Sequence, residues 1–474
     1  MDMRSSGVFY TGMRTPRIAT VAVVALMASF IPGPAQASAG FSPGAPGAGD
    51  PYFPDMGNGG YDVSHYDLDL RYDPATRALD GTARIAARAT QSLSRFNLDF
   101  QGPLTIDALT VNGASAGYTR EGAQELVITP PFGLRNGSAF AVEVSYHGVP
   151  QKIDDPQLGA SGWVATADGA VALNQPFGAA TFFPVNDTPR DKATYGYKLT
   201  VPNGLVALAN GEPGPPQTAD GWTTSTWRMD QPMASELAMV AIGQFTVHAD
   251  AVNITAIDTA LDPHDRLGQA FHDLTAEVQA WEETVFGPYP FGSTGGIIDQ
   301  VGVYYALETQ GRPVYDQTDA KLDTATIVHE LAHQWFGNSV SPNKWADIWL
   351  NEGFATYAEW LHSEHSGGKT VQQIFDKTYA QKPDAFVWRG IVADPGRDNI
   401  FNSLVYNRGA MTLHALRLRI GDGAFFTLIR RWAAEHRYGN VSTPDFIALA
   451  EQVSGQQLDD LFTKWVYTSG KPAL

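Results

Sequence analysis

The sequence predicts a multidomain protein in which an N-terminal all-β, sandwich-like domain precedes a mainly helical α+β domain. Between residues 61 and 250, short segments alternate apolar and polar residues, which is the period of half-buried strands. From about residue 262 onward, apolar residues recur every three or four positions, which is the period of an amphipathic helix. The chain has 474 residues, which is too many for a single hydrophobic core, so we expect at least two domains.

The first 37 residues have the features of an export signal. Arg14 and Arg17 precede an apolar run over residues 18–31, and a small-residue Ala-Gln-Ala site follows at residues 35–37. A run of 14 residues is too short to span a bilayer comfortably. The absence of cysteine is compatible with export, because a chain of this size can fold without disulfides. We therefore expect a secreted protein, extracellular or periplasmic, after removal of the signal peptide.

The next segments predict a leader and then the all-β domain. Residues 38–60 are rich in glycine, proline, alanine and serine, so we expect them to form a flexible leader. Residues 66–72 and 141–146 alternate apolar and polar side chains, and residues 83–88 do so less strictly. Asn-Gly pairs that begin at residues 112, 136 and 210 are typical of turns. The prediction for residues 61–250 is two packed β-sheets.

The second domain is expected over residues 251–474. Apolar residues keep helical spacing over residues 267–285, and the Phe-Gly-Pro-Tyr-Pro stretch at residues 286–290 should end that helix. Helical patterns then dominate to the end of the sequence. This domain carries the most informative motif of the chain.

That motif is His329-Glu330-Leu331-Ala332-His333. Four residues along a helix turn through about 400°, so both imidazoles should emerge from one face. Glu352 follows in an Asn-Glu-Gly segment, and two imidazoles with one carboxylate form a three-ligand set for zinc that leaves a fourth position open. Glu330 should lie about 100° around the helix from the ligands. This offset suits a general base, which would take a proton from the attacking water and return it to the leaving amine.

The alternative interpretation of the motif is a surface helix with two unrelated histidines. Its apolar neighbours argue against exposure, and they are Ile327, Val328, Leu331, Trp335 and Phe336. Buried imidazole pairs normally require a partner, which favours the metal site. His362 and His365 around Glu364 could imitate a second metal site, but we expect them on a solvated helix face.

The net charge of the chain limits the kinds of molecule that are expected to bind to it. The formal net charge is −18, and removal of residues 1–37 would leave 29 basic and 49 acidic residues. Such a surface argues against nucleic acid and anionic membrane as partners. No later segment is long and apolar enough to serve as a membrane anchor. The sequence leaves the oligomeric state open, and we favour a monomer.

Three further segments, together with the zinc motif, resemble the pattern of a known protein family. A Tyr-Ala-Leu-Glu-Thr stretch covers residues 305–309, Tyr406 precedes Arg-Gly-Ala, and Gln175 precedes a Phe-Pro-Val-Asn-Asp stretch at residues 183–187. With the zinc motif, the chain over residues 61–474 resembles the gluzincin zinc aminopeptidases, the aminopeptidase N-like family. The resemblance implies a thermolysin-like catalytic domain, one Zn²⁺ per chain, and removal of N-terminal residues from peptides.

The resemblance also implies roles for single residues. Glu308 corresponds to the residue that binds the free amine of the substrate, Gln175 to a glutamine that lines the amine site, and Ala306 to the other retained position of that strand. Tyr406 corresponds to the catalytic tyrosine, which would donate a hydrogen bond to the developing oxyanion. Two structural alternatives remain open. Tyr406 could be a core aromatic residue, and Glu308 could form a salt bridge with a nearby arginine, Arg312 or Arg408.

The sequence also departs from the family pattern at several positions, and these differences lead to further expectations. Tyr305, Leu307 and Thr309 replace the usual glycine, methionine and asparagine, which could reshape the first specificity pocket, and Ala180 stands where many relatives carry arginine. We expect a short member without the C-terminal sandwich and helical domains of larger relatives, and hence a less enclosed site. The competing hypotheses are a zinc endopeptidase, epoxide chemistry on the same site, and a non-catalytic binding protein.

Overall fold

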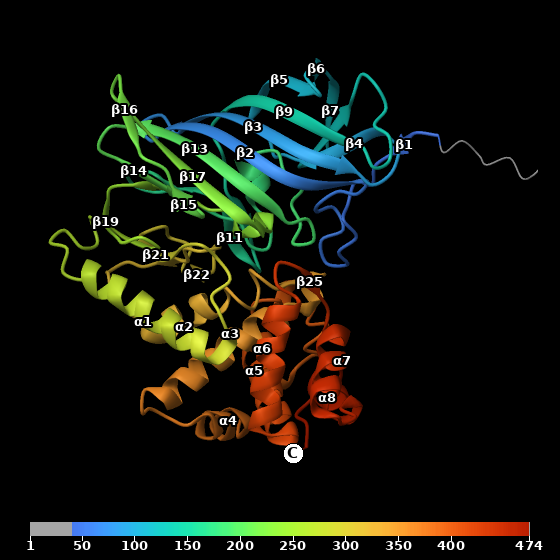
Figure 1. Cartoon of the computed structure of the whole chain (residues 1–474), viewed down its shortest axis with the longest axis vertical. Coiled ribbons are helices and arrows are strands. Elements are labelled where there is room, and N and C mark those ends of the chain that lie inside the picture. Colours follow the sequence, from blue (N-terminus) through green and yellow to red (C-terminus); the bar gives the residue numbers. More distant parts are fainter. Residues whose placement is uncertain (1–39, 474) are drawn as a thin grey trace, which may run out of the picture. The chain divides into compact units, whose positions relative to one another are not determined.

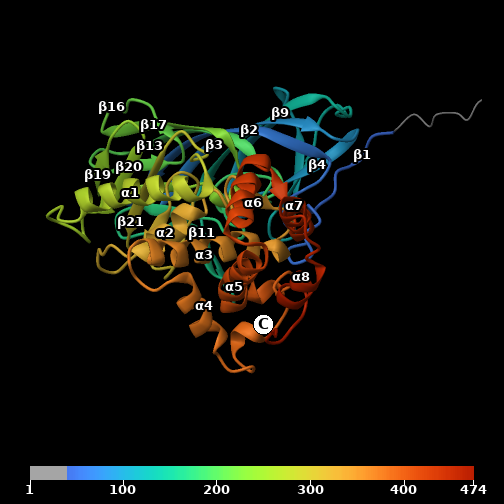
Figure 2. The same ribbon diagram turned by 60° about the horizontal axis from the view of Figure 1, so that its bottom comes forward.

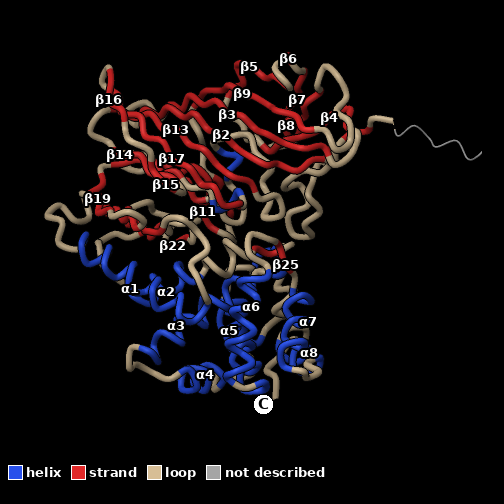
Figure 3. Tube along the Cα trace, viewed as in Figure 1, coloured by secondary structure: helices blue, strands red, loops and turns tan. Residues whose placement is uncertain are grey.

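The computed structural model describes residues 40–473, and the expected export signal lies outside these residues. Strands dominate the N-terminal part of the chain and helices the C-terminal part (Figure 3). The part from Phe41 onward forms one compact unit. The predicted class, an all-β domain followed by a mainly helical domain, is confirmed (Figure 1).

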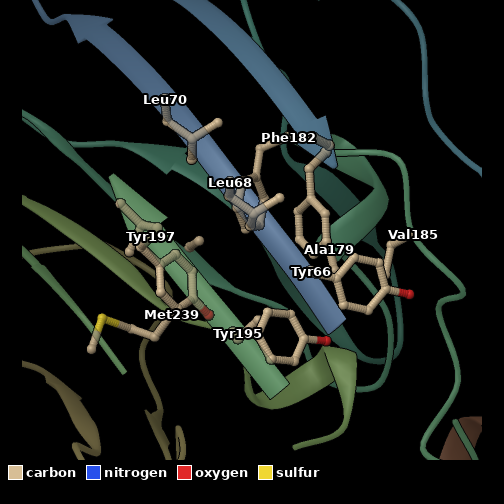
Figure 4. Close-up of a cluster of buried hydrophobic side chains, with 14 of the residues drawn as sticks. Tyr66, Leu68, Leu70, Ala179, Phe182, Val185, Tyr195, Tyr197 and Met239 are labelled. Carbon is tan, nitrogen blue, oxygen red and sulfur yellow. The ribbon is translucent and has the colours of Figure 1, made fainter. Parts of the chain in front are cut away.

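The all-β domain is built on a nine-stranded sheet. Its strands run in the order β15-β17-β13-β2-β3-β9-β5-β6, with β16 paired to β17. Their bounds are β2 Tyr61–Asp73, β3 Ala78–Ala89, β5 Thr105–Val111, β6 Ala114–Ser115, β9 Ala139–Gly148, β13 Ala193–Pro202, β15 Glu212–Pro213, β16 Gln217–Ala219 and β17 Trp222–Met233. Burial alternates along these strands as the sequence predicts, and β3 follows the pattern most regularly. Figure 4 shows aromatic and aliphatic side chains of β2 and β13 gathered in the core, among them Tyr66, Leu68, Tyr195 and Tyr197.

Two smaller sheets complete this domain, so the prediction of two sheets is wrong. One sheet contains β1 Ser42–Pro43, β4 Leu93–Asp99, β7 Gly117–Glu121 and β8 Glu125–Thr129. The other contains β10 Ile153–Asp155, β11 Gly159–Ala165, β12 Ala170–Leu173, β14 Val206–Ala209 and β18 Val240–Gly243. All three sheets contribute to one hydrophobic cluster. Alternation reveals strands and their buried faces, but it does not reveal which strand pairs with which.

The prediction of a flexible leader over residues 38–60 is also wrong for the part of this segment that the structure describes. β1 pairs with β4, and the backbone N–H of Asn58 donates a 2.6 Å hydrogen bond to the side chain of Asn186. The carboxylate of Asp50 accepts a 2.8 Å hydrogen bond from the backbone of Trp345, 295 residues away. A segment rich in glycine and proline has little secondary structure of its own, but partners distant in sequence hold this one in place.

A five-stranded mixed sheet begins the second domain. Its order is β19-β20-β21-β23-β22, with bounds β19 Phe245–Ala249, β20 Asn253–Asp258, β21 Thr294–Asp299, β22 Ala306–Leu307 and β23 Val314–Asp316. The expected boundary at residue 250 falls between β19 and β20, which form a hairpin of this sheet. β22 is one of the two edge strands of this sheet, and it is important for the site described below.

Helices occupy most of the remaining chain. They are α1 Gly268–Phe286, α2 Thr324–Ala332, α3 Trp349–His365, α4 Val371–Tyr379, α5 Ser403–Ile420, α6 Asp422–Glu435, α7 Thr443–Ser454 and α8 Asp459–Trp465. Short 3₁₀ helices cover Ala179–Thr181, Ser235–Leu237, Trp345–Asp347, Phe386–Trp388 and Arg397–Asn399, and the strands β24 Ser341–Pro342 and β25 Asn440–Val441 pair in parallel. α1 matches the helix predicted over residues 267–285. α3 packs against both α2 and α5 (Figure 2). Within residues 40–473, no helix has the length and apolar character needed to cross a membrane.

Candidate active site

The zinc motif lies at the end of α2. The side chain of Asp323 caps the start of this helix, where it accepts a 3.2 Å hydrogen bond from the backbone of Ala325. His329 lies in the last turn and His333 is the C-cap residue, still with right-handed helical φ and ψ angles. Both imidazoles therefore emerge from one face, and their ring centroids are 4.8 Å apart. Local helix geometry is sufficient to place the first two candidate ligands.

The first turn of α3 brings Glu352 to the two imidazoles. Its Oε2 atom lies 3.2 Å from Nε2 of His329 and 3.3 Å from Nε2 of His333. The three candidate ligand atoms all lie within 4.8 Å of one another. Glu352 is only 2% exposed, and a carboxylate buried to this extent requires a compensating cation. Two imidazole nitrogens and one carboxylate oxygen that converge in this way fit a catalytic zinc ion.

The other ring nitrogens of both histidines are already engaged. Nδ1 of His329 donates a 2.6 Å hydrogen bond to Glu359, and Nδ1 of His333 donates a 3.0 Å hydrogen bond to the backbone carbonyl of Phe336. Such contacts orient the rings and leave Nε2 free to bind a metal. The sequence reasoning missed Glu359. It follows Glu352 by seven residues, or two helical turns, and this spacing places both carboxylates on one face of α3.

Glu330 points into the same space. Its side chain is buried, and Oε2 has no hydrogen-bond partner in the described part of the chain. Burial is the main cause that raises the pKa of Glu330, to about 8, and nearby carboxylates add to the effect. Glu308, Glu330 and His333 form a second cluster whose ligand atoms lie within 4.8 Å of one another. A carboxylate of this kind can accept a proton from a group bound between it and the metal ligands.

These acidic groups shape the electrostatics of the imidazoles. Burial by itself would lower the pKa of His333, but Glu308 and Glu352 raise it to about 9. For Glu352, burial acts to raise the pKa, but His333 and His329 outweigh it and lower the pKa to about 2. The centre thus carries a negative field that favours a cation.

Glu308 and Gln175 meet across the two domains. Nε2 of Gln175 donates a 2.6 Å hydrogen bond to Oε1 of Glu308. The backbone carbonyl of Glu308 accepts hydrogen bonds from Asn338, at 2.6 Å, and from Gln334, at 3.2 Å. Ala306, on β22, lies two residues before Glu308 on the same face of the extended chain. Ala306 and Glu308, the two positions of this segment that match the family pattern, therefore lie at the same site.

The salt-bridge alternative for Glu308 does not hold. The guanidinium group of Arg312 donates to the carbonyls of Ala209 and Gly211. Arg408 donates to four carbonyls, those of Gly390, Lys464, Trp465 and Thr468. Within residues 40–473, Glu308 has no salt-bridge partner although it is 3% exposed.

Tyr406, on α5, lies against the metal ligands. Its ring stacks on the imidazole of His329, with centroids 5.8 Å apart and planes at 12°. Burial raises the pKa of Tyr406 well above its usual range, and the carboxylates Glu352, Glu308 and Glu330 add to the effect. The hydroxyl therefore keeps its proton and can act as a hydrogen-bond donor. Tyr406 is half-buried, and its ring packs against the hydrophobic core of this domain as well as against His329.

His362 and His365 are not part of the cluster of candidate zinc ligands. Both lie against the indole of Trp281, with centroid distances of 4.8 and 5.6 Å. Neither residue belongs to the two candidate metal clusters found in the described chain.

Both domains match known protein families. Residues 63–237 match the Peptidase M1 N-terminal domain, and residues 311–465 match the Peptidase family M1 domain. Among curated relatives, Aminopeptidase M1-B of Oryza sativa subsp. japonica is 27% identical over 451 residues, which cover 86% of this chain and 50% of the relative. Aminopeptidase 2, mitochondrial, of Saccharomyces cerevisiae is 25% identical over 455 residues, which cover 86% of this chain and 46% of the relative. The chain thus spans about half the length of these curated relatives.

Solved structures match over nearly their full length. The M1 zinc metallopeptidase of Deinococcus radiodurans is 30% identical, has a TM-score of 0.82, and aligns over 90% of this chain and 98% of its own. A mutant of that protein bound to a Tyr-Ser-Ala substrate is 31% identical, with a TM-score of 0.81 and coverage of 90% and 98%. The cofactor of this family is zinc, and His329, His333 and Glu352 provide the ligands that it requires. The chain therefore belongs to the M1 family of zinc metallopeptidases.

Proposed function

We propose that this protein is an aminopeptidase that removes N-terminal residues from peptides. The observation that carries the proposal is the carboxylate of Glu308, which is buried beside the zinc ligands and forms no salt bridge within residues 40–473. An unpaired buried carboxylate is strongly unfavourable. The α-ammonium group of a peptide would supply the missing charge, and Gln175 would orient the carboxylate that receives it.

The spacing of the site supports a cut after one residue. Carboxylate oxygens of Glu308 and Glu330 lie within 4.8 Å of each other and of a His333 nitrogen. An ammonium group at Glu308 therefore leaves room for about one residue before the chain reaches the zinc ligands. The first peptide bond, and no later one, would lie at the reactive centre.

The proposed mechanism assigns one task to each side chain. His329, His333 and Glu352 would hold the zinc ion, which would supply Lewis acidity to the scissile carbonyl and lower the pKa of a water molecule. Glu330 takes a proton from the attacking water and delivers it to the nitrogen of the leaving amine. Tyr406 donates a hydrogen bond to the oxyanion that develops on the carbonyl. Its raised pKa supports this task, because the hydroxyl stays protonated at neutral pH.

The relatives agree with this proposal. The curated relatives named above are aminopeptidases by name, and structures of the two-domain M1 zinc metallopeptidase mutant are bound to L-tryptophan and to L-arginine. Each of those amino acids has a free α-amine beside a very different side chain. A site that anchors the amine accounts for the shared binding.

A comparison of blocked and free substrates tests the proposal. Initial rates of the zinc-loaded protein are measured on leucine p-nitroanilide and on its N-acetylated form. We expect at least about 100-fold preference for the free amine, because the acetyl group removes the charge that Glu308 requires. Glu308→Gln should remove most of this preference. Glu143→Gln, at an exposed position of β9, is the control and should change nothing.

The other outcomes point to the competing functions. Similar rates on both substrates would favour an endopeptidase built on the same zinc site. Binding of peptide without cleavage would favour a non-catalytic binding protein.

We also propose that the protein is exported, on the basis of the charged, apolar and small-residue pattern of residues 1–37. N-terminal sequencing of protein recovered outside the cytoplasm should begin at Ser38. Protein that stays in the cytoplasm with its N-terminus intact would contradict this proposal.

A further inference from the structure

A lysine of the all-β domain reaches into the catalytic domain. Lys192 directly precedes β13, and its ammonium group donates hydrogen bonds to the backbone carbonyls of Asn338 (3.0 Å), Ser339 (2.9 Å) and Gly439 (3.1 Å). A lysine ammonium has three N–H donors and no acceptor, so these three carbonyls match its donors one to one. Lys192 therefore joins two separate loops of the catalytic domain to the start of β13.

The loop that leads to Lys192 makes a second contact in the same place. The side chain of Asn440 donates to the carbonyl of Pro189 at 2.8 Å and to that of Pro342 at 3.1 Å. Pro342 and Asn440 belong to β24 and β25, the parallel pair of strands that the two loops lead into. The all-β domain thus docks on this pair, and Lys192 supplies a charged group at the contact.

The position of this ammonium group is costly. Lys192 is partly buried, and burial lowers the pKa of its amine to about 7, although Glu236 acts in the opposite direction. Removal of a charge from water is unfavourable unless other hydrogen bonds replace those to water. Apolar side chains could join two domains at less cost. The loops that the ammonium holds account for the cost, because one of them leads directly to the amine site.

That loop holds the backbone of the residue that receives the amine. The side chain of Asn338 donates a 2.6 Å hydrogen bond to the carbonyl of Glu308, and its backbone N–H donates a 3.0 Å hydrogen bond to the carbonyl of His333. Asn338 is fully buried. Its own carbonyl accepts from Lys192, so one residue connects the all-β domain to Glu308 and to the end of the zinc helix.

We propose that Lys192 is a positioning residue of the amine site. Through Asn338 it holds the backbone of Glu308 where the carboxylate meets the α-ammonium group of the substrate. Gln175 contacts the same carboxylate directly, whereas Lys192 acts on the backbone that carries it. This inference rests on the proposed aminopeptidase function, because that function gives Glu308 its task.

The first test is Lys192→Met, which keeps most of the side-chain length and removes the three donors. Rates of the full zinc-loaded protein are measured on leucine p-nitroanilide and on its N-acetylated form. We expect KM for the free amine to rise about tenfold, with kcat changed less than threefold, because a displaced carboxylate binds the ammonium less well. For the acetylated form, kcat/KM should change less than twofold, since it brings no charge to Glu308.

Lys198→Met is the matched control. Lys198 lies on β13 at an exposed position, where it pairs with Asp69, so the same substitution should leave both rates unchanged. Equal losses on the free and the acetylated substrate in Lys192→Met would overturn the proposal, since a general disturbance of the fold affects both. An unchanged KM for the free amine would also overturn it.

A double-mutant cycle tests whether the effect passes through Asn338. Asn338→Ala removes the side chain that donates to Glu308 and keeps the backbone contact with His333. In this background, Lys192→Met should reduce kcat/KM for the free amine by less than twofold, against about tenfold in the unmodified protein. Losses that multiply would show that Asn338 does not transmit the effect, and they would overturn the proposal.

Lys192→Gln serves if the methionine variant does not fold. Its amide keeps two N–H donors on a shorter side chain, so KM for the free amine should rise about threefold, again with little change for the acetylated form. An equal loss on both substrates, or no loss on either, would contradict the role of Lys192.

Hydrogen exchange separates this proposal from the proposed function, because it requires no turnover. In Lys192→Met, the amides of Asn338 and Ser339 and those of residues 307–310 should exchange at least about tenfold faster than in Lys198→Met. Faster exchange would show that Lys192 holds the backbone of Glu308 even if the unmodified protein did not distinguish free from acetylated amines. That failure would instead contradict the aminopeptidase. Unchanged exchange at residues 307–310 would overturn the role of Lys192.

Discussion

Gln175 in the all-β domain and Glu308 in the catalytic domain are joined by a 2.6 Å hydrogen bond across 133 residues of sequence. The amide donates to a carboxylate that faces the zinc ligands, so each domain contributes to the proposed amine site. Hydrogen bonds to charged groups typically contribute about 1.5–3 kcal/mol. The all-β domain is therefore expected to take a direct part in substrate binding.

Gln175→Ala should weaken substrate binding more than it slows the chemical step. Without the amide, Glu308 loses a donor that lowers its pKa, so it is less able to hold an ammonium group. We expect KM for leucine p-nitroanilide to rise about tenfold with kcat nearly unchanged. Gln157→Ala, at an exposed position of the same domain, is the control. A fall in kcat with constant KM would assign Gln175 to the chemical step.

Glu330→Gln should reduce kcat by at least about 100-fold and leave zinc bound. The amide has nearly the same shape but cannot accept the proton of the attacking water. Metal content is measured together with the rate, because a loss of zinc would imitate a loss of the base. A variant with full activity and full zinc content would disprove the assignment.

Tyr406→Phe should lower kcat by about 100- to 1,000-fold, which is the usual effect of the loss of one oxyanion donor. The ring that stacks on His329 remains, so the variant removes the hydroxyl and preserves the packing. KM should change little, because the hydrogen bond strengthens only as charge develops on the carbonyl. A rise in KM with constant kcat would instead indicate a role in substrate binding.

Glu359→Gln should weaken zinc affinity by about 10- to 100-fold. The carboxylate accepts the Nδ1–H of His329 at 2.6 Å and makes the opposite nitrogen a better ligand. Competition with a chelator measures the change, and added zinc should restore activity. Glu277→Gln, at an exposed position of α1, provides the control. If both variants retain zinc equally, Glu359 has no part in metal binding.

His414 should make the protein less stable in mild acid. It is buried on α5 between Tyr357 (3.2 Å) and Gln372 (3.1 Å). Burial is the first cause that lowers its pKa, to about 4, and Arg417 adds to the effect. The neutral form is favoured in the folded state, so stability is full above the unfolded pKa of about 6.5 and falls as the pH decreases toward 4.

Urea unfolding at pH 7.5 and pH 5 measures this effect. At pH 5 the contribution of His414 amounts to about 2 kcal/mol. The His414→Gln variant keeps a polar group but cannot titrate, so it should lose about 2 kcal/mol less than the unmodified protein between the two pH values. Identical pH dependence of both proteins would contradict the role of His414.

Some expectations failed because they depended on long-range pairing. The composition of residues 38–60 predicted a flexible leader, but β1 pairs with β4 and Asp50 binds the backbone of Trp345. Two sheets were expected over residues 61–250, and the structure has three. The hydrogen bond between Glu359 and His329 was not predicted, although the seven-residue spacing between Glu352 and Glu359 is visible in the sequence.

Features that arise from local periodicity can be predicted from the sequence. The i, i+4 geometry of one helix places His329 and His333 on a common face, and alternation along β2 and β3 separates buried from exposed side chains. The contact of Gln175 with Glu308 and the stacking of Tyr406 on His329 could be seen only in the folded chain. Local patterns are set by backbone hydrogen bonding within a few residues. Contacts across 50 to 150 residues instead depend on which sheets and helices pack together, and no short stretch of sequence specifies that.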